Sequence, residues 1–439
     1  MKLILRLLVC FTLITMMVSS VNAQPYTILW TDDVHTNDIA LSKDGQYVAL
    51  VRPLADSGEL RFYSRSSGTP LWTWSSEETL YSVAISEDGD CVAAGGEQHI
   101  YFWKNAKILT GNPDPTWSSI WLGRIDRKAL DISNDGNYVA ACGTGVNVFY
   151  WANAKGRSTG SEPTTWQVEI SYVNVEAIDL SSDGDFVAAG SNLDAWGKAR
   201  VLYWKNARTL TGAPPPTWMS TSPDDQIVDV AVSDDGDYVA AGGRLGPSPV
   251  YYWANAKSLS DDPPTTWESA SGVDFSSIDM SSNGDSVIAG AIGTGRGVYF
   301  WSGARSLSGT PSTTWTYPTE GDVHDVAINS LGDYMAADLN IMVPGRVYFF
   351  DNMGNVLWDY EISLADKLSI SGDGATLAVG TEVPYTGYLF DTGYSSHRPV
   401  GGFVISVNKL AVLTPYLALA GLVAALTTIL VARSRRKTN

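Results

Sequence analysis

Short apolar runs recur along the chain in pairs, and each pair is joined by Ser-x-Asp-Gly or a close variant of it. The motif occurs eight times, at intervals of 42 to 52 residues, with its glycines at Gly45, Gly89, Gly136, Gly184, Gly236, Gly284, Gly332 and Gly374. Because glycine supplies the positive φ that a tight turn needs, each motif predicts the turn of a β-hairpin. The apolar runs on either side are predicted to be antiparallel strands.

Each repeat continues with two further β-rich runs. In the fifth repeat these are residues 250–253, Val-Tyr-Tyr-Trp, and residues 264–268, Pro-Thr-Thr-Trp-Glu. Four middle repeats place Asn-Ala-Lys or Asn-Ala-Arg between these runs, and the asparagine side chains are predicted to cap a single helical turn. These asparagines are Asn105, Asn153, Asn206 and Asn255. The pattern predicts four strands in each repeat.

Four strands with a period of 40 to 50 residues are typical of a β-propeller, in which one repeat forms one blade. The run at 26–30 resembles a fourth strand, whereas the last repeat stops after its third strand at 388–390. We therefore expect the N-terminal strand to complete the last blade and close the ring. The predicted fold class is all-β, an eight-bladed β-propeller followed by one C-terminal transmembrane helix.

The order of the strands and the aromatic end of the third strand resemble the WD-repeat and quinoprotein-like propeller families. Residues 68–72, Gly-Thr-Pro-Leu-Trp, and 351–358, Asp-Asn-Met-Gly-Asn-Val-Leu-Trp, are similar to the ending of pyrroloquinoline-quinone-type repeats. The resemblance covers about residues 24–393 and implies the fold. The middle repeats depart from it, since the Asp of a Trp-Asp dipeptide is missing there. The adjacent cysteine pair of quinone-dependent dehydrogenases is missing as well.

Both ends of the chain carry apolar segments outside the repeats. Residues 1–23 begin with basic residues, continue without charge and end in Val-Asn-Ala, which predicts a secretory signal peptide. Residues 409–432 contain an uncharged stretch long enough to cross the roughly 30 Å hydrocarbon core as a helix. Residues 433–439 form a basic tail, and basic residues stay on the cytoplasmic side. We expect a single-pass cell-membrane protein with an extracytoplasmic propeller at 24–393 and a linker at 394–408.

The C-terminal segment also resembles prokaryotic sorting signals that are cut and replaced by another anchor. The Leu-Pro-x-Thr-Gly motif of ordinary Gram-positive sortase substrates is not in the sequence. The sequence therefore leaves two alternatives, in which the apolar helix is either kept as the anchor or cut off and replaced by another anchor. The arrangement indicates a membrane-anchored surface protein of a prokaryote, which includes the archaea.

The predicted ectodomain is strongly acidic. Seven of the 29 Lys and Arg residues lie in the signal peptide, the membrane segment and the tail, whereas all 47 Asp and Glu residues lie between them, so the ectodomain's formal charge is −25. A surface of this sign repels phosphate backbones, which argues against nucleic acid as a partner.

No motif of a catalytic site is found in the sequence. The four histidines lie in different repeats without a His-Glu-x-x-His spacing, and neither Gly-x-Ser-x-Gly nor a phosphate-binding Gly-x-x-x-x-Gly-Lys segment occurs. We therefore predict that the protein is not an enzyme and that it has no cofactor.

Two sets of residues are candidates for a site. The innermost strands supply one carboxylate in six of the eight repeats, from Asp38, Asp131, Asp179, Asp229, Asp279 and Asp325. These carboxylates either accept hydrogen bonds from amides of the next blade or hold a cation in the central channel. The loops between second and third strands vary most, and the longest spans 191–200. Because loops on a rigid scaffold carry function, a partner is expected at Arg52, Trp196, Arg200, Arg244, Arg296 and Arg346.

Taken together, the sequence predicts a membrane-anchored, extracytoplasmic β-propeller that acts as a non-catalytic binding or protein-interaction scaffold for a protein or glycan. The alternatives are a structural component of a cell-envelope assembly and an enzyme of quinoprotein-like type with a site in the channel.

Overall fold

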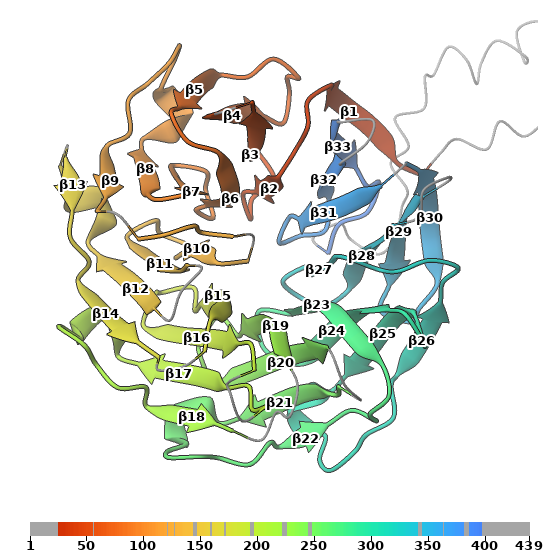
Figure 1. Ribbon diagram of the computed structural model, residues 1–439. Coiled ribbons are helices and arrows are strands. Elements are labelled where there is room, and N and C mark those ends of the chain that lie inside the picture. The colour runs from red at the N-terminus through yellow and green to blue at the C-terminus, as the bar shows by residue number, and fades with distance from the viewer. Residues whose placement is uncertain are drawn as a thin grey trace, which may run out of the picture. The chain divides into compact units, whose positions relative to one another are not determined.

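The eight predicted hairpins build eight sheets arranged in a ring around a central axis (Figure 1). The computed structural model describes residues 25–396, apart from 56, 121, 127, 144–146, 159, 171–172, 194–196, 222–225, 245–247, 341–344, 363 and 382–385. Each sheet is one blade, and its strands are given below from the axis outward.

Blade 1 contains β2 (Asp38–Leu41), β3 (Tyr47–Leu54), β4 (Ser57–Ser64) and β5 (Trp72–Ser76). Blade 2 contains β6 (Leu80–Ile85), β7 (Cys91–Gly96), β8 (Ile100–Lys104), β9 (Trp117–Ser119) and the added β13 (Ser161–Glu162). Blade 3 contains β10 (Leu130–Ile132), β11 (Tyr138–Cys142), β12 (Asn147–Ala152) and β14 (Trp166–Glu169). Blade 4 contains β15 (Val175–Leu180), β16 (Phe186–Ser191), β17 (Val201–Lys205) and β18 (Trp218–Ser220).

Blade 5 contains β19 (Gln226–Val232), β20 (Tyr238–Arg244), β21 (Val250–Ala254) and β22 (Trp267–Glu268). Blade 6 contains β23 (Asp274–Met280), β24 (Ser286–Ile292), β25 (Gly297–Ser302) and β26 (Trp315–Pro318). Blade 7 contains β27 (Val326–Ile328), β28 (Tyr334–Leu339), β29 (Arg346–Asp351) and β30 (Val356–Glu361). Blade 8 contains β31 (Ala365–Ile370), β32 (Thr376–Thr381), β33 (Gly387–Asp391) and β1 (Thr27–Asp32).

The pairing of β1 with β33 confirms that the N-terminal strand closes the ring. The two strands run antiparallel, with Thr27 opposite Asp391 and Asp32 opposite Gly387. The last blade is thus built from both ends of the described chain, and this closes the ring.

The Ser-x-Asp-Gly motif is a turn that satisfies its own polar groups. In blade 5, the Ser233 hydroxyl donates to Asp235 Oδ1 at 2.8 Å and accepts the Tyr238 amide at 3.0 Å, while Gly236 has φ 76°. Asp235 Oδ1 also accepts the amide of Asp237 at 3.0 Å. The serine, aspartate and glycine are therefore fixed by the hairpin itself.

The variable residue of the motif joins neighbouring blades. Its backbone carbonyl accepts an amide from the preceding blade in all eight blades, at 2.8 to 3.1 Å. The donor is the variable residue of that preceding blade except in blade 1, where it is Asp44, the residue after the variable Lys43. The series runs through Asp44, Glu87, Asn134, Ser182, Asp234, Ser282, Ser330 and Gly372, and Gly372 donates to Lys43. These eight bonds form a belt that links every blade to the next near the axis.

The predicted helical turns are confirmed as 3₁₀ turns, but the prediction that asparagine side chains cap them is wrong. The turns are η1 (Ala106–Ile108), η2 (Ala154–Gly156), η3 (Ala207–Thr209), η4 (Ala256–Ser258) and η5 (Ala304–Ser306). The four preceding asparagines make no side-chain cap bond and have φ of 56° to 58°, whereas Gly303 precedes η5 with φ 67°. Asparagine is used because it tolerates the left-handed conformation better than other side chains do.

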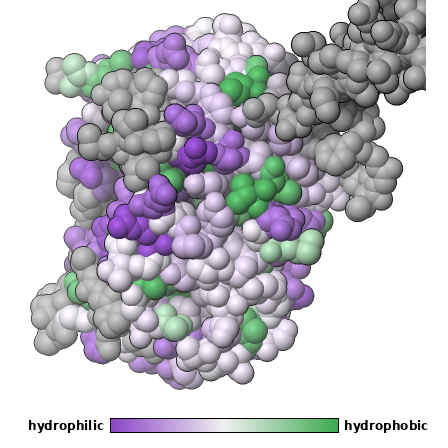
Figure 2. Space-filling model, turned by 90° about the vertical axis from the view of Figure 1, so that its right-hand side faces the viewer, coloured by the Kyte–Doolittle hydropathy of each residue, from purple (hydrophilic) through white to green (hydrophobic). Residues whose placement is uncertain are grey.

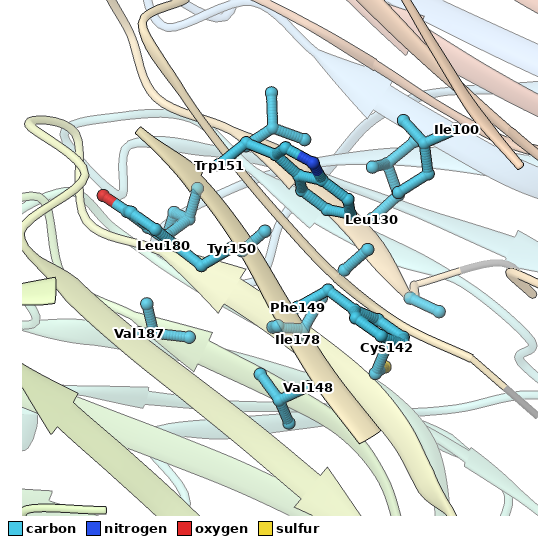
Figure 3. Close-up of a cluster of buried hydrophobic side chains, with 14 of the residues drawn as sticks. Ile100, Leu130, Cys142, Val148, Phe149, Tyr150, Trp151, Ile178, Leu180 and Val187 are labelled. Carbon is cyan, nitrogen blue, oxygen red and sulfur yellow. The ribbon is translucent and has the colours of Figure 1, made fainter. Parts of the chain in front are cut away.

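Aromatic side chains fill the space between blades. Phe102 of blade 2 stacks on Trp117 of the same blade at 5.1 Å between ring centroids, and Trp117 lies 5.9 Å from Trp151 of blade 3. The Trp117 indole also donates to the carbonyl of Ala154 at 3.0 Å. Figure 3 shows part of this core, in which Trp151, Ile178 and other labelled residues come from different blades.

Among the described residues, no helix is long and apolar enough to cross a membrane. The predicted signal peptide, most of the linker, the predicted membrane helix at 409–432 and the basic tail lie outside the described part of the chain.

Candidate functional site

The six axial aspartates bind the backbone of the following blade. In each, Oδ2 accepts one amide N–H from the innermost strand of a neighbouring blade. The pairs are Asp38 with Val83 (2.9 Å), Asp131 with Leu180 (2.8 Å), Asp179 with Val232 (2.6 Å), Asp229 with Ile278 (2.9 Å), Asp279 with Ile328 (2.8 Å) and Asp325 with Leu368 (2.9 Å). These bonds are the first of the two roles predicted from the sequence, so the carboxylates join blades.

The six carboxylates lie at two levels along the axis. Asp38, Asp229 and Asp325 stand four residues before the first residue of their turn motif. Asp131, Asp179 and Asp279 stand two residues before it. Two strand residues span about 7 Å, so the two sets are separated along the axis. In the described part of the chain, no three His, Cys, Asp or Glu side chains are grouped so that they could hold a metal ion.

A lysine crosses the axis at the first level. Lys128 lies before β10 in blade 3, and its ammonium pairs with Asp229 of blade 5, donates to Ser277 Oγ of blade 6 at 2.8 Å and lies 3.5 Å from Asp325 Oδ1 of blade 7. Lys128 has φ 64°, and its carbonyl accepts the Ile178 amide at 2.9 Å. One side chain therefore connects four blades.

A second lysine crosses the axis at the mouth formed by the Asp-Gly turns. Lys43 of blade 1 and Asp234 of blade 5 form an ion pair of 2.8 Å, and both are variable residues of the motif. Sequence reasoning missed Lys43 and Lys128, since a single lysine beside a strand carries no recognisable pattern. Their roles follow only from the closed ring, which brings distant repeats together.

The second level has a different charge balance. Burial raises the pKa of Asp279 from 3.8 to about 7. Burial is also the main cause that raises the pKa of Asp131, and it raises that of Asp179 well above its usual value with the further effect of the nearby Asp131. At the first level, burial also raises the pKa of Asp229, although the ammonium group of Lys128 opposes this shift.

Three of the five arginines predicted to contact a partner are bonded to neighbouring groups of the propeller. Arg52 binds Glu59 through two bonds of 3.0 and 3.2 Å, Arg346 forms an ion pair with Asp359, and Arg296 donates to the carbonyl of Glu320 at 3.0 Å. Each of these three arginines is therefore engaged by its own part of the surface. Arg244 is exposed at the end of β20, Arg200 precedes β17, and Trp196 lies outside the described residues.

The opposite rim also pairs its own charges. Lys107 binds Asp88 at 2.8 Å, Arg208 binds Asp185 at 3.0 Å and Arg305 binds Asp285 at 3.1 Å. A shallow pocket of about 460 Å³ lies on this rim where blades 2 to 4 meet, with Tyr138 and Arg208 among its lining residues. The three ion pairs of this rim are exposed, so each contributes about 0 to 1 kcal/mol to the free energy of unfolding.

The outer edges of five blades are covered by the following blade, which the sequence analysis did not foresee. The residue after the outermost tryptophan donates its amide to a carbonyl of the next connection, and we call this contact the edge bond. The edge bonds are Thr73 to Gly111 (3.0 Å), Ser118 to Gly160 (3.2 Å), Gln167 to Gly212 (3.0 Å), Met219 to Asp261 (2.9 Å) and Glu268 to Gly309 (2.9 Å). Gly-x-Pro segments follow the helical turns at 111–113, 212–214 and 309–311, and they are the signal that could have indicated three of these bonds.

The eight blades around one axis define a β-propeller. A family model for the WD domain, G-beta repeat, matches residues 68–104, which extend from the end of blade 1 through the third strand of blade 2. None of the curated proteins matches the chain.

Two solved structures resemble the propeller. BamB from Moraxella catarrhalis is 16% identical with a TM-score of 0.53, over 83% of this chain and 97% of BamB. The C-terminal WD40 domain of Sif2 is 12% identical with a TM-score of 0.62, over 84% of this chain and 98% of that domain. At these identities the likeness shows the fold.

Proposed function

We propose that this protein is a membrane-anchored β-propeller that presents a non-catalytic, protein-binding scaffold outside the cytoplasmic membrane. The observation that carries the proposal is the use of the axial polar groups. The aspartates hold amides of neighbouring blades, and Lys43 and Lys128 hold carboxylates of distant blades. Side chains that would serve a channel-site enzyme are committed to the frame, which leaves the outer surface for recognition.

The location is proposed from the two terminal segments. The signal peptide at 1–23 exports the chain, and the apolar helix at 409–432 with its basic tail anchors it. We expect the full chain to fractionate with membranes and its propeller to be digested by protease added to intact spheroplasts. A chain ending at residue 408 is expected in the medium or periplasm. Recovery of that shorter chain in the membrane fraction contradicts an anchor at 409–432.

The binding role is tested with the full chain in detergent. We expect a tagged chain to recover a partner from solubilised native envelope, and the purified partner to bind it again at defined stoichiometry. A chain with loop 191–200 shortened tests whether the variable-loop face takes part. Concentration-dependent self-association without any heterologous partner favours the alternative role in an envelope assembly.

A further inference from the structure

Three ionisable side chains from blades 3, 5 and 7 meet at the first level of the axis. The Lys128 ammonium pairs with the Asp229 carboxylate and lies 3.5 Å from Asp325 Oδ1. The Ser277 hydroxyl connects two of these groups, since it accepts from Lys128 Nζ at 2.8 Å and donates to Asp325 Oδ1 at 2.9 Å. An amine and a carboxyl group are therefore held together beside a second carboxylate, with a hydroxyl between the amine and that carboxylate.

The three groups are largely shielded from solvent. The side chains of Lys128, Asp229 and Asp325 are 19%, 9% and 13% exposed. Figure 2 shows the outer side of the ring, where hydrophilic side chains are instead in contact with solvent. Because water stabilises ions, its partial exclusion at the axis shifts an ammonium and a carboxylate toward the neutral amine and acid. Burial accordingly raises the pKa of Asp229, although Lys128 opposes this shift.

The backbone around Asp229 activates its carboxyl group. The Ile278 amide donates to Oδ2 at 2.9 Å, and the Val230 amide donates to Oδ1 at 3.0 Å. Fixed N–H donors of this kind polarise a carboxyl carbon and stabilise the negative charge that forms on oxygen when a nucleophile adds. The carboxyl carbon of Asp229 is therefore the electrophile of the cluster, and the nitrogen of Lys128 is the nucleophile.

We propose that Lys128 and Asp229 form an isopeptide bond, which converts their ion pair into a covalent link between blades 3 and 5. The ammonium first donates a proton to Asp229, and the neutral Lys128 nitrogen then adds to the carboxyl carbon. The nitrogen passes a proton through the Ser277 hydroxyl to Asp325, which gives it to the hydroxyl group that leaves as water. One N–C bond forms, one C–O bond breaks and one water is released, so the step needs no oxidant or reductant.

The fold supplies the driving force that the reaction lacks in dilute solution. Free amines and carboxylates condense poorly in water, whereas reacting groups held in place act at effective concentrations of about 10⁵ to 10⁸ M. Lys128 is held because its backbone carbonyl accepts the Ile178 amide at 2.9 Å. The ion pair is the state that precedes the reaction, and the product joins residues 101 positions apart across the axis. The bond is independent of the binding role proposed above.

The second axial pair is a matched control within the same molecule. Lys43 and Asp234 are 2.8 Å apart, but their side chains are 25% and 41% exposed. Among the described residues, no second carboxylate forms an ion pair with Lys43. This pair has an amine and a carboxylate but lacks both the shielding and the proton acceptor. It is therefore expected to remain an ion pair.

Peptide mass spectrometry of the purified full chain, denatured and digested with trypsin, tests the proposal. Trypsin does not cleave after a lysine in an isopeptide bond, so we expect peptide 128–155 joined to peptide 209–244. The combined mass is expected to be smaller by the mass of one water, and fragmentation is expected to place the link at Asp229. The peptide that contains Lys43 is expected to be unlinked, which excludes condensation during sample preparation.

Asp325→Asn tests the proton transfer. Asparagine keeps an oxygen for the Leu368 amide but does not take up the proton, so the linked peptide is expected to fall at least about tenfold. Lys128→Arg keeps a cation beside Asp229 and removes the nucleophilic amine. This variant is expected to give no linked peptide and to melt at a lower temperature than the wild type.

Three results overturn the proposal. The first is folded wild-type protein in which trypsin cleaves completely after Lys128, because this cleavage requires an unmodified lysine. The second is as much linked peptide in Asp325→Asn as in the wild type. The third is a link from Lys128 to a carboxylate other than Asp229. If Asp325→Asn shows no melting transition and is therefore unfolded, the wild-type digest alone decides.

Discussion

Lys43 and Asp234 form an ion pair across the axis of the ring, between blades that lie opposite one another. The two residues are 191 positions apart in the sequence, yet they occupy the same place in their respective turns. Their side chains are 25% and 41% exposed, in contrast to the deeper Lys128 and Asp229 at 19% and 9%. The two lysine–aspartate pairs therefore lie in different environments, and we expect them to contribute different amounts to the free energy of unfolding.

Lys128→Met is expected to destabilise the protein by about 3 kcal/mol, because it leaves the buried Asp229 carboxylate without its cation. Lys43→Met, which breaks an exposed pair, is expected to cost less than about 1 kcal/mol. Denaturant unfolding of the full chain measures both. Equal losses in the two variants contradict the assignment of Lys128 as the main axial support.

The stability of the propeller is expected to fall as pH rises from 5 to 8. The pKa of Asp279 is raised from 3.8 to about 7, so the folded state keeps a proton that the unfolded chain has already lost. The resulting stabilisation is present at low pH and is lost as pH passes through the raised pKa. Asp131 and Asp179 act in the same direction.

Melting temperatures at pH 5 and pH 8 check this dependence, and Asp279→Asn serves as its control. An asparagine keeps an oxygen to accept the Ile328 amide but does not titrate. The variant is expected to show a smaller difference between the two pH values, and an unchanged difference contradicts the role of Asp279.

Trp218→Phe is expected to destabilise the protein by about 2 kcal/mol, since it removes apolar contacts and the indole bond to the Ala256 carbonyl at 2.9 Å. Trp315→Phe is the comparison, because Trp315 makes the same kind of bond to Asn352 at 3.1 Å but is partly exposed. The Trp315→Phe variant is expected to lose about half as much free energy of unfolding as Trp218→Phe. Chemical unfolding followed by circular dichroism measures both changes.

Asn255→Ala is expected to cost about 1 kcal/mol, because alanine does not favour the left-handed conformation with φ 58°. Asn255→Gly is expected to be nearly neutral, as glycine takes this position naturally at Gly303. Thermal unfolding of the two variants measures the difference, and equal losses contradict a conformational role for Asn255.

The repeats made the architecture predictable, since strand number, strand order and ring closure all follow from local patterns. The axial aspartates were also found from the sequence, because they recur two or four residues before the turn motifs. Contacts between residues at different positions of the repeat could not be predicted from the repeat pattern. Lys128 meets Asp229 only after three blades have been placed, and pairs such as Arg52 with Glu59 depend on strand register. The missed edge bonds depend on connections whose path the strand pattern does not determine.

The belt of backbone bonds through the turn motifs has no beginning and no end. Every donor in it points the same way around the ring, and the bonds pass through the blade built from both ends of the chain as they pass through blades 2 to 7. The ring of backbone bonds therefore does not depend on where the polypeptide begins. New termini introduced in an exposed connection, with the old ones joined, should give a circular permutant that assembles the same eight blades.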